Sequence, residues 1–141
     1  MKTQAQKSKS TSQRLLKTYG ITLAERDAME TKCGNCCEVC GNPPVNRPLH
    51  IDHDHKWRYI KVAVEKEGTG WKGVATYLGK EFAAFGTRRN PVIQHIRKML
   101  QKASVRGLIC WADNKLLREA RDNPENLRAA ARYLERHQEG K

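Results

Sequence analysis

The chain has 141 residues, a formal net charge of +12 and 38% hydrophobic residues, with only 6% aromatic ones. This length accommodates one ordinary domain or two very small ones, and so lean a composition predicts a thin core that a bound metal would stabilise. The chain has no run of about 18 apolar residues, which excludes a transmembrane helix. Its start, MKTQAQKSKSTSQ, lacks the apolar stretch of a secretory signal. We therefore expect a soluble, cytoplasmic protein with no membrane partner.

The positive charge is concentrated in two segments of the chain. Residues 1–19 carry five basic and no acidic side chains, and residues 56–106 carry twelve basic and three acidic ones. Residues 20–55 have a net charge of −3. Such clustering predicts a surface that binds the phosphates of a nucleic acid, because +12 exceeds what solubility requires in so short a chain. The alternative is a solvated basic face that only keeps the protein soluble.

The N-terminal part is predicted to contain little regular structure. We expect disorder over residues 1–10 and a short helix over 12–18 that ends before a glycine. Thr22 and Glu25 then have the spacing of a capping box, which predicts a second helix over residues 23–32.

The middle of the chain is predicted to be mainly β-structure. LHIDHDH (49–55) and WRYIKVAVE (57–65) have the composition of strands, the second with alternating apolar residues. KEGTG (66–70) predicts a turn, so WKGVATYLG (71–79) should pair back, and EFAAFG (81–86) can add a third short strand.

The C-terminal third is predicted to contain three helices and one strand. Asn90 followed by Pro91 indicates a helix start. VRGLIC (105–110) is a short apolar strand, and helices should follow over 113–121 and from 124 to about 137. The apolar stripe expected on the helix that starts near Asn90 contains Val92, Ile96, Met99, Leu100 and Ala103. The residues expected to face inward on the last helix are Leu127, Ala130, Ala131 and Leu134.

Four of the five cysteines lie in CGNCCEVC, residues 33–40, and the fifth is Cys110. An odd number, tight spacing and the lack of a secretory signal favour metal ligation over disulfides. A zinc site commonly takes two ligands from a C-x-x-C turn and two from elsewhere. We therefore predict a zinc site that involves Cys37, Cys40 and Cys110, the alternative being free buried cysteines.

The fourth ligand of this zinc site is left open by the spacing. Position 113, where a second C-x-x-C turn would place its cysteine, is occupied by Asp113. Its carboxylate can bind zinc through oxygen, or it can be the N-cap of the following helix. Cys33 or Cys36 can complete the site instead.

LHIDHDH combines carboxylates and imidazoles at a density that ordinary turns do not require. A one-metal nuclease needs oxygen ligands for a hard cation and a neutral imidazole that deprotonates water. Strict alternation would put Asp52 and Asp54 on one face of the strand and His53 and His55 on the other. The strand must therefore end or bulge for Asp52 and His53 to share a site. The alternatives are a transition-metal site and surface histidines.

Three blocks of the sequence resemble the recombination endonuclease VII family of phage-type HNH, or ββα-metal, nucleases. They are YGITLAERDAMETKCGNCCEVCG (19–41), LHIDHDH (49–55) and VRGLICWADNKLLREARDNPENLRAAARYLE (105–135). Together the blocks cover about 60 residues, and their combination is far more specific than a lone C-x-x-C. For a phage-encoded member of this family the expected location is the host cytoplasm.

The resemblance implies an α+β fold and a division of the chain. A small zinc-stapled ββα-metal nuclease core (HNH, His-Me finger) is expected over 19–55 and 105–141, with flanking helices. A basic, flexible N-terminus is expected over 1–18, and residues 56–104 form a β-hairpin and helix insertion in the core.

The resemblance also implies catalytic roles. Asp52 aligns with the family's metal-binding aspartate and Asn114 with its metal-binding asparagine, so these two are expected to bind a catalytic Mg²⁺, for which Mn²⁺ can substitute. His53 aligns with the general base and His55 with a second histidine at the phosphate. The implied reaction is hydrolysis of a phosphodiester to a 5′-phosphate and a 3′-hydroxyl.

For the zinc site the resemblance is incomplete. Cys37, Cys40 and Cys110 align with three structural zinc ligands, and the family's fourth cysteine falls at Asp113. Cys33 and Cys36 have no counterpart in the family.

Residues 56–104 stand where the family usually has a short loop, and they carry most of the positive charge. Strands followed by a helix weakly resemble AP2/integrase-type DNA-binding modules; the alternative is an extended hairpin that enlarges the sheet. The candidate phosphate contacts in either case are Arg58, Lys61, Lys72, Arg88, Arg89, Arg97, Lys98 and Lys102.

Three functions are compatible with these residues. The first is an endonuclease that resolves branched DNA such as Holliday junctions, and family resolvases of this kind work as intertwined dimers, so a homodimer is a candidate assembly. The second is a sequence-selective HNH nicking or homing-type endonuclease whose insertion reads the groove. The third is a non-catalytic, zinc-containing nucleic-acid-binding protein.

Overall fold

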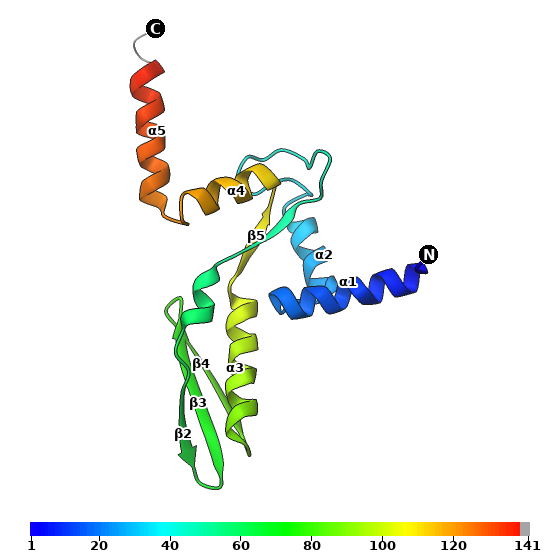
Figure 1. Ribbon diagram of the computed structural model, residues 1–141, viewed down its shortest axis with the longest axis vertical. Helices are drawn as coiled ribbons and strands as arrows, with labels where there is room; N and C mark the ends of the chain where they lie inside the picture. The colour runs from blue at the N-terminus through cyan, green and yellow to red at the C-terminus, as the bar shows by residue number, and fades with distance from the viewer. Residues whose placement is uncertain (139–141) are drawn as a thin grey trace.

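The computed structural model describes residues 1–138. Over these residues the chain forms five α-helices, one 3-10 helix and two antiparallel sheets, which confirms the α+β class. The elements in chain order are α1 (Gln4–Tyr19), α2 (Leu23–Lys32), β1 (His50–His53), η1 (His55–Tyr59), β2 (Ala63–Glu67), β3 (Gly70–Tyr77), β4 (Lys80–Gly86), α3 (Arg89–Ala103), β5 (Val105–Ile109), α4 (Trp111–Glu119) and α5 (Pro124–Gln138). In Figure 1 the β1–β5 pair lies between the β2–β4 sheet with α3 at one end and α4 with α5 at the other.

Helix α1 begins much earlier than predicted, so the expectation of disorder over residues 1–10 is wrong. The Thr3 side chain accepts a hydrogen bond from the N–H of Gln6, and the Gln6 side chain accepts one from the N–H of Thr3. This capping box satisfies the first free N–H groups of the helix and allows it to start at Gln4. The helix ends at Gly20, whose φ of +72° is the left-handed conformation that glycine adopts without strain.

Helix α2 confirms its prediction, whereas α3 starts at Arg89, with Arg88 as its N-cap in place of the predicted Asn90. Helix α2 covers the predicted range and has the capping box of Thr22 and Glu25. Of the stripe predicted on α3, Val92, Ile96 and Leu100 are buried against the neighbouring sheet and Ala103 packs beside them, while Met99 is only half-buried.

Strands β1 and β5 form an antiparallel pair with one irregularity. His50 lies opposite Ile109 and Asp52 opposite Gly107, but His53 lies opposite Val105. Arg106 is therefore the extra residue of a β-bulge on β5, while β1 itself ends at His53, which is one of the two ways in which Asp52 and His53 can share a site. Residues of this pair belong to the first hydrophobic cluster, which consists of Leu15, Ile21, Cys37, Leu49, Ile51, Leu108 and Ile109.

Strands β2, β3 and β4 form the second sheet, and α3 packs across it. The buried residues between them make the second hydrophobic cluster, which consists of Ala75, Tyr77, Ala84, Val92, Ile96 and Leu100. The helix approaches β3 so closely that a Cβ on Gly73 would lie 2.6 Å from Cδ1 of Ile96 and 2.8 Å from Cγ1 of Val92. This glycine is therefore required by packing, although its φ is ordinary.

The strand predicted over residues 57–65 is only partly correct. The 3-10 helix η1 occupies His55–Tyr59, and β2 starts at Ala63. The side chain of Asp54 caps η1 by accepting a hydrogen bond from the N–H of Lys56, so the chain turns before it becomes extended. The alternating Ile60 and Val62 still pack against the second cluster.

The last two helices differ from prediction in position and in burial. Helix α4 starts at Trp111, two residues before the predicted Asp113. The inward face expected on α5 is wrong, because Leu127 is only half-buried and Leu134 is 57% exposed. Figure 1 shows the reason: α5 projects away from the rest of the protein. Within residues 1–138, no helix is both long enough and apolar enough to cross a bilayer.

Candidate active site and metal cluster

The four residues predicted to act in catalysis line one cavity of about 520 Å³. Asp52, His53 and His55 come from β1 and the start of η1, and Asn114 comes from α4, which packs against β1. This cavity, the active-site cavity below, also has basic side chains on its wall, namely Lys56, Arg106, Arg118 and Arg121. Basic side chains on a cavity wall can attract a phosphate group.

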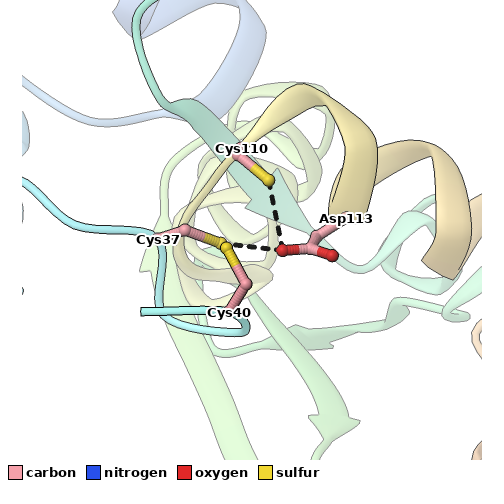
Figure 2. A group of neighbouring side chains, drawn as sticks. All are labelled: Cys37, Cys40, Cys110 and Asp113. Carbon is pink, nitrogen blue, oxygen red and sulfur yellow. Dashed lines mark hydrogen bonds between the residues drawn. The ribbon is translucent and has the colours of Figure 1, made fainter. Parts of the chain in front are cut away.

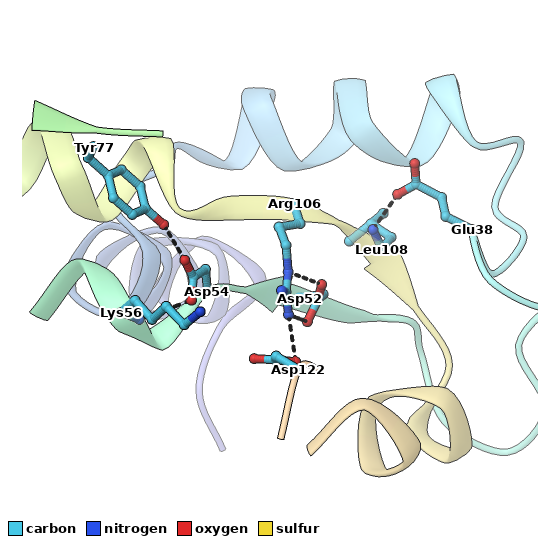
Figure 3. A network of polar contacts seen from close by, with 8 residues as sticks. All are labelled: Glu38, Asp52, Asp54, Lys56, Tyr77, Arg106, Leu108 and Asp122. Carbon is cyan, nitrogen blue, oxygen red and sulfur yellow. Dashed lines mark hydrogen bonds and ion pairs between the residues drawn. The ribbon is translucent and has the colours of Figure 1, made fainter. Parts of the chain in front are cut away.

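Asp52 is buried and is held by an arginine. Nε of Arg106 donates to Oδ2 of Asp52 at 2.7 Å, and Nη2 donates to Oδ1 at 3.0 Å. Nη2 also donates to Oδ1 of Asp122 at 3.2 Å, so the guanidinium joins two carboxylates (Figure 3). The ion pair with Asp52 raises the pKa of Arg106, which stays charged.

His53 is half-buried and packed by two rings. Its imidazole meets the ring of Tyr19 edge-on at 5.2 Å and lies 4.3 Å from the ring of His55, measured between ring centroids. Burial lowers the pKa of His53, and the neighbouring His55 lowers it further. The neutral imidazole, which is the form that can accept a proton from water, is therefore favoured.

Asp54 also lines this cavity, but its carboxylate joins β1 to the second sheet. Its Oδ2 accepts a hydrogen bond of 2.7 Å from the hydroxyl of Tyr77, and its own N–H donates to the carbonyl of Ser104 at 2.9 Å. Burial opposes ionisation of the carboxyl, but the N–H of Lys56 and the hydroxyl of Tyr77 together lower the pKa of Asp54. The residue thus has a structural role.

A second group of ligand-bearing side chains lies at the far end of β5. Cys37, Cys40, Cys110 and Asp113 place their ligand atoms within 4.8 Å of one another, a set that can hold a metal such as zinc. Figure 2 shows these side chains converging from the loop after α2 and from the start of α4. Among residues 1–138 this metal cluster does not include Cys33 or Cys36.

Asp113 takes part in the metal cluster and does not cap the helix. The N-cap of α4 is Cys110, and Oδ2 of Asp113 accepts hydrogen bonds of 3.1 Å from the thiols of Cys37 and Cys110. These bonds lower the pKa of Asp113. The N–H of Asp113 lowers the pKa of Cys110, but the Asp113 carboxylate, burial and the neighbouring thiols outweigh it and raise that pKa to about 11.

A model of the recombination endonuclease VII family matches residues 12–136, nearly the whole chain. The protein belongs to this family. Membership supports a DNA endonuclease activity, with DNA as the substrate. A search of curated proteins and a search of solved structures each find no match.

Several residues around the active-site cavity are not predictable from motif spacing alone. Arg106 lies inside VRGLIC, where it resembles an ordinary exposed strand residue, and Asp122 lies in a turn. Tyr77 is far from the site in sequence. A buried Asp52 needs a counter-ion, and Arg106 is the basic residue on the strand expected to pair with LHIDHDH, so this contact could have been predicted from the sequence.

The candidate phosphate contacts of the insertion are distributed over α3, η1 and the sheet. Arg88, Arg89 and Lys98 are exposed on or next to α3. Lys102 instead forms an ion pair of 2.8 Å with Glu25 of α2. Arg97 donates to the carbonyl of Arg58 at 3.2 Å. The set also includes Lys61, which is exposed, and Lys72, whose ammonium lies 5.6 Å from the ring of Phe85.

Proposed function

We propose that this protein is an HNH-type DNA endonuclease that hydrolyses phosphodiester bonds with a divalent cation and resolves branched DNA such as Holliday junctions. The observation that carries the proposal is the convergence of Asp52, His53, His55 and Asn114 on one cavity, in a chain of the recombination endonuclease VII family.

The donor set of the cavity fits a hard cation. The carboxylate of Asp52 and the side-chain amide of Asn114 supply the oxygen atoms that Mg²⁺ and Mn²⁺ prefer. Bound there, a divalent ion would neutralise charge that develops on the phosphate and on the leaving oxygen. Since both oxygens of Asp52 are held by Arg106, loading this site requires the guanidinium to move.

His53 is the general base of this proposal. Its lowered pKa keeps the imidazole neutral, and its ring is fixed between Tyr19 and His55. A neutral imidazole accepts the proton from the attacking water, and a fixed ring aims its free nitrogen. His55 and the basic residues on the cavity wall, Lys56, Arg118 and Arg121, would bind the phosphate.

The metal cluster is proposed to bind structural zinc through three thiolates and one carboxylate oxygen. Cys37 belongs to the first hydrophobic cluster, and Cys110 follows β5 directly. A bound zinc would therefore fix α4, and with it Asn114, relative to the strand that carries Asp52 and His53.

Residues 56–104 are proposed to be a DNA-binding module inserted in the nuclease core. The unit has a sheet, a covering helix and a hydrophobic cluster of its own. The exposed basic side chains of Arg88 and Arg89 lie at the start of α3. These features favour a second candidate function, a sequence-selective nicking or homing-type endonuclease in which this unit reads the DNA.

A homodimer is proposed because α5 lacks a partner for its apolar side chains within residues 1–138. Tyr133 is 54% and Leu134 57% exposed on this helix. Packing two copies of α5 together would bury both side chains. Analytical ultracentrifugation should give a dimer that Leu134→Glu converts to a monomer; a monomeric wild type would disprove this assembly.

The decisive experiment compares cleavage of a four-way junction with cleavage of linear duplexes that contain the same arms. We expect cutting of the junction in Mg²⁺ and none in EDTA. Equal cutting of a linear arm at one site would favour the sequence-selective endonuclease. Binding without cutting in Mg²⁺ or Mn²⁺ would favour the non-catalytic nucleic-acid-binding protein.

A further inference from the structure

The ion pair between Arg106 and Asp52 occupies the carboxylate that the proposed reaction needs. Both carboxylate oxygens accept hydrogen bonds from the guanidinium, at 2.7 and 3.0 Å, and Asp52 is only 8% exposed. A buried carboxylate is costly without a counter-ion, and Arg106 provides it. A second cation on the same two oxygens would be repelled by the guanidinium, so Arg106 and a divalent ion compete for Asp52.

The backbone places Arg106 for this contact while leaving it free to move. Arg106 is the extra residue of the β-bulge, since Gly107 and Val105 lie opposite Asp52 and His53. A bulge re-aims the side chain of the extra residue. The side chain of Arg106 is 40% exposed and lies on the wall of the active-site cavity, so no core packing holds it in one position.

The carboxylate of Asp122 lies within hydrogen-bond distance of the same guanidinium. Nη2 of Arg106 already donates to Oδ1 of Asp122 at 3.2 Å (Figure 3). Asp122 lies between α4 and α5, where Arg121 and Asp122 have φ values of +56° and +53°. Two successive non-glycine residues in the left-handed region are unfavourable, which indicates that the surrounding structure holds this turn in place.

We propose that Arg106 is an exchangeable counter-ion: it neutralises Asp52 when no cation is bound and shifts onto Asp122 when a divalent ion takes Asp52. This inference rests on the proposed function, because it concerns the same cation site. Arg106 is then a positioning residue that acts through Asp52. It keeps the carboxylate oriented in the cation-free protein and raises the cation concentration that the site needs.

The exchange is measurable without DNA and without cleavage. Full-length protein that retains its zinc is titrated with Mn²⁺, and free Mn²⁺ is followed by electron paramagnetic resonance. The Arg106→Gln protein should bind Mn²⁺ at least about tenfold more tightly than the wild type. An adjacent opposite charge shifts the binding of a cation such as a proton to a carboxylate by roughly one to three powers of ten. Asp52→Asn should remove this binding and identifies the signal that belongs to the site.

Asp122 provides a second, opposite test. Asp122→Asn removes the carboxylate that receives the guanidinium, so Mn²⁺ should bind several-fold more weakly than to the wild type. In the Arg106→Gln background the same change should have little effect, because no guanidinium remains to be received. An equal loss in both backgrounds would mean that Asp122 acts through its own charge, which would overturn its role in the exchange.

The outcomes separate the inference from the function on which it rests. A folded Arg106→Gln protein with unchanged or weaker Mn²⁺ affinity overturns the exchange and leaves the nuclease proposal standing. Unchanged Mn²⁺ affinity in Asp52→Asn instead removes the cation site from the proposed function. Should Arg106→Gln not fold, Arg106→Lys keeps the charge but loses the bidentate pair, and it should bind Mn²⁺ more tightly than the wild type. No gain in that variant overturns the exchange.

Discussion

The two hydrophobic clusters of this chain are built in different ways. The second cluster comes from one continuous stretch, in which α3 covers β3 and β4 and Gly73 allows the helix to approach closely. The first cluster collects residues from α1, from the loop after α2, from β1 and from β5, so its contacts join distant parts of the sequence. It is also the cluster beside the active-site cavity and the metal cluster.

The difference indicates what each part needs in order to fold. Contacts within a continuous segment close short loops and cost little chain entropy. Bringing distant segments together costs more chain entropy, and the β1–β5 pair has only two short strands to offset that cost. The first cluster therefore gains more stability from a bound metal than the second. The part with the proposed chemistry is therefore expected to depend on zinc, while the inserted part is not.

Metal removal should have the largest effect and should affect only one of the two clusters. Chelation of zinc, or Cys40→Ser, should release β1 and β5, because structural zinc contributes on the order of 10 kcal/mol, comparable to the whole stability of a small domain. Hydrogen exchange should rise at the amides of β1 and β5 and stay slow in α3 and β3. The exposed Cys40 is chosen because its replacement leaves no hole in the core.

Cys36→Ser is the matched control, since Cys36 lies in the same loop and outside the metal cluster. It should keep the zinc content and the exchange pattern of the wild type. Equal loss of protection in α3 and in β1 after chelation would show that the two clusters fold as one unit, and the comparison would fail.

His53→Ala should have the next largest effect and should separate chemistry from binding. Loss of a general base lowers the cleavage rate by about 10²- to 10⁴-fold, while DNA affinity should be retained because the basic residues remain. Single-turnover cleavage and electrophoretic mobility shift measure the two properties. His95→Ala, at an exposed position of α3, is the control and should cut at the wild-type rate. Near wild-type cutting by His53→Ala would contradict the assignment of the base.

Charge removal on the inserted part should weaken DNA binding without affecting the chemistry of bound DNA. Arg88→Gln with Arg89→Gln should reduce the slope of log affinity against log salt by about 1.8, since each phosphate contact on duplex DNA contributes about 0.9. Lys66→Gln with Lys80→Gln removes the same charge from the sheet and should change the slope less. Equal effects of the two pairs would mean that α3 has no special part in binding.

Substitution is a sharper test of the insertion than its deletion. The insertion, residues 56–104, includes Tyr77, whose hydroxyl donates to Asp54, and it ends at Ser104, whose carbonyl accepts the N–H of Asp54. Removing the segment would therefore disturb β1 as well as DNA binding, and the two causes could not be told apart.

The parts of the fold that depend on local sequence were predictable. The capping box of Thr22 fixed the start of α2, and the apolar spacing on α3 identified its buried face. The metal cluster followed from ligand chemistry, and Asp52, His53 and His55 of LHIDHDH line one cavity, whereas their catalytic roles stay predictions. The spacing left Asp113 open as a ligand or an N-cap, with Cys33 and Cys36 as other fourth ligands; only the hydrogen bonds from the thiols of Cys37 and Cys110 place its carboxylate in the cluster.

The wrong predictions concern features that depend on contacts between elements distant in the sequence or on capping that the apolar pattern does not show. The apolar stripe of α5 is a normal inward-facing pattern, yet within residues 1–138 Tyr133 and Leu134 stay exposed, and pattern alone cannot reveal whether a second copy covers them. The bidentate pair of Arg106 depends on a bulge in the β1–β5 register, which no local signal specifies. Residues 4–10 are exposed and only Ala5 among them is apolar, so this first part of α1 rests on capping by Thr3 and not on a buried face.

The smallest effect is expected where the two parts meet. Tyr77→Phe keeps the ring in the second cluster and removes the hydroxyl that donates to Asp54. A hydrogen bond to a charged group contributes about 1.5–3 kcal/mol, so the variant should unfold with a free energy lower by about that amount near pH 7. Thr76→Ala, at the exposed neighbouring position, is the control and should stay near the wild type.

The pH dependence of this loss identifies its cause. Because the pKa of Asp54 is lowered in the folded protein, its contribution to stability is present above the ordinary value of 3.8 and is lost as the pH falls through the lowered value. The difference between wild type and Tyr77→Phe should therefore be constant near neutrality and shrink in acid. A difference that persists at low pH would point to packing by the hydroxyl. A difference near zero at pH 7 would mean that the carbonyl of Ser104 and the packing of α3 suffice to hold β1 against the second sheet.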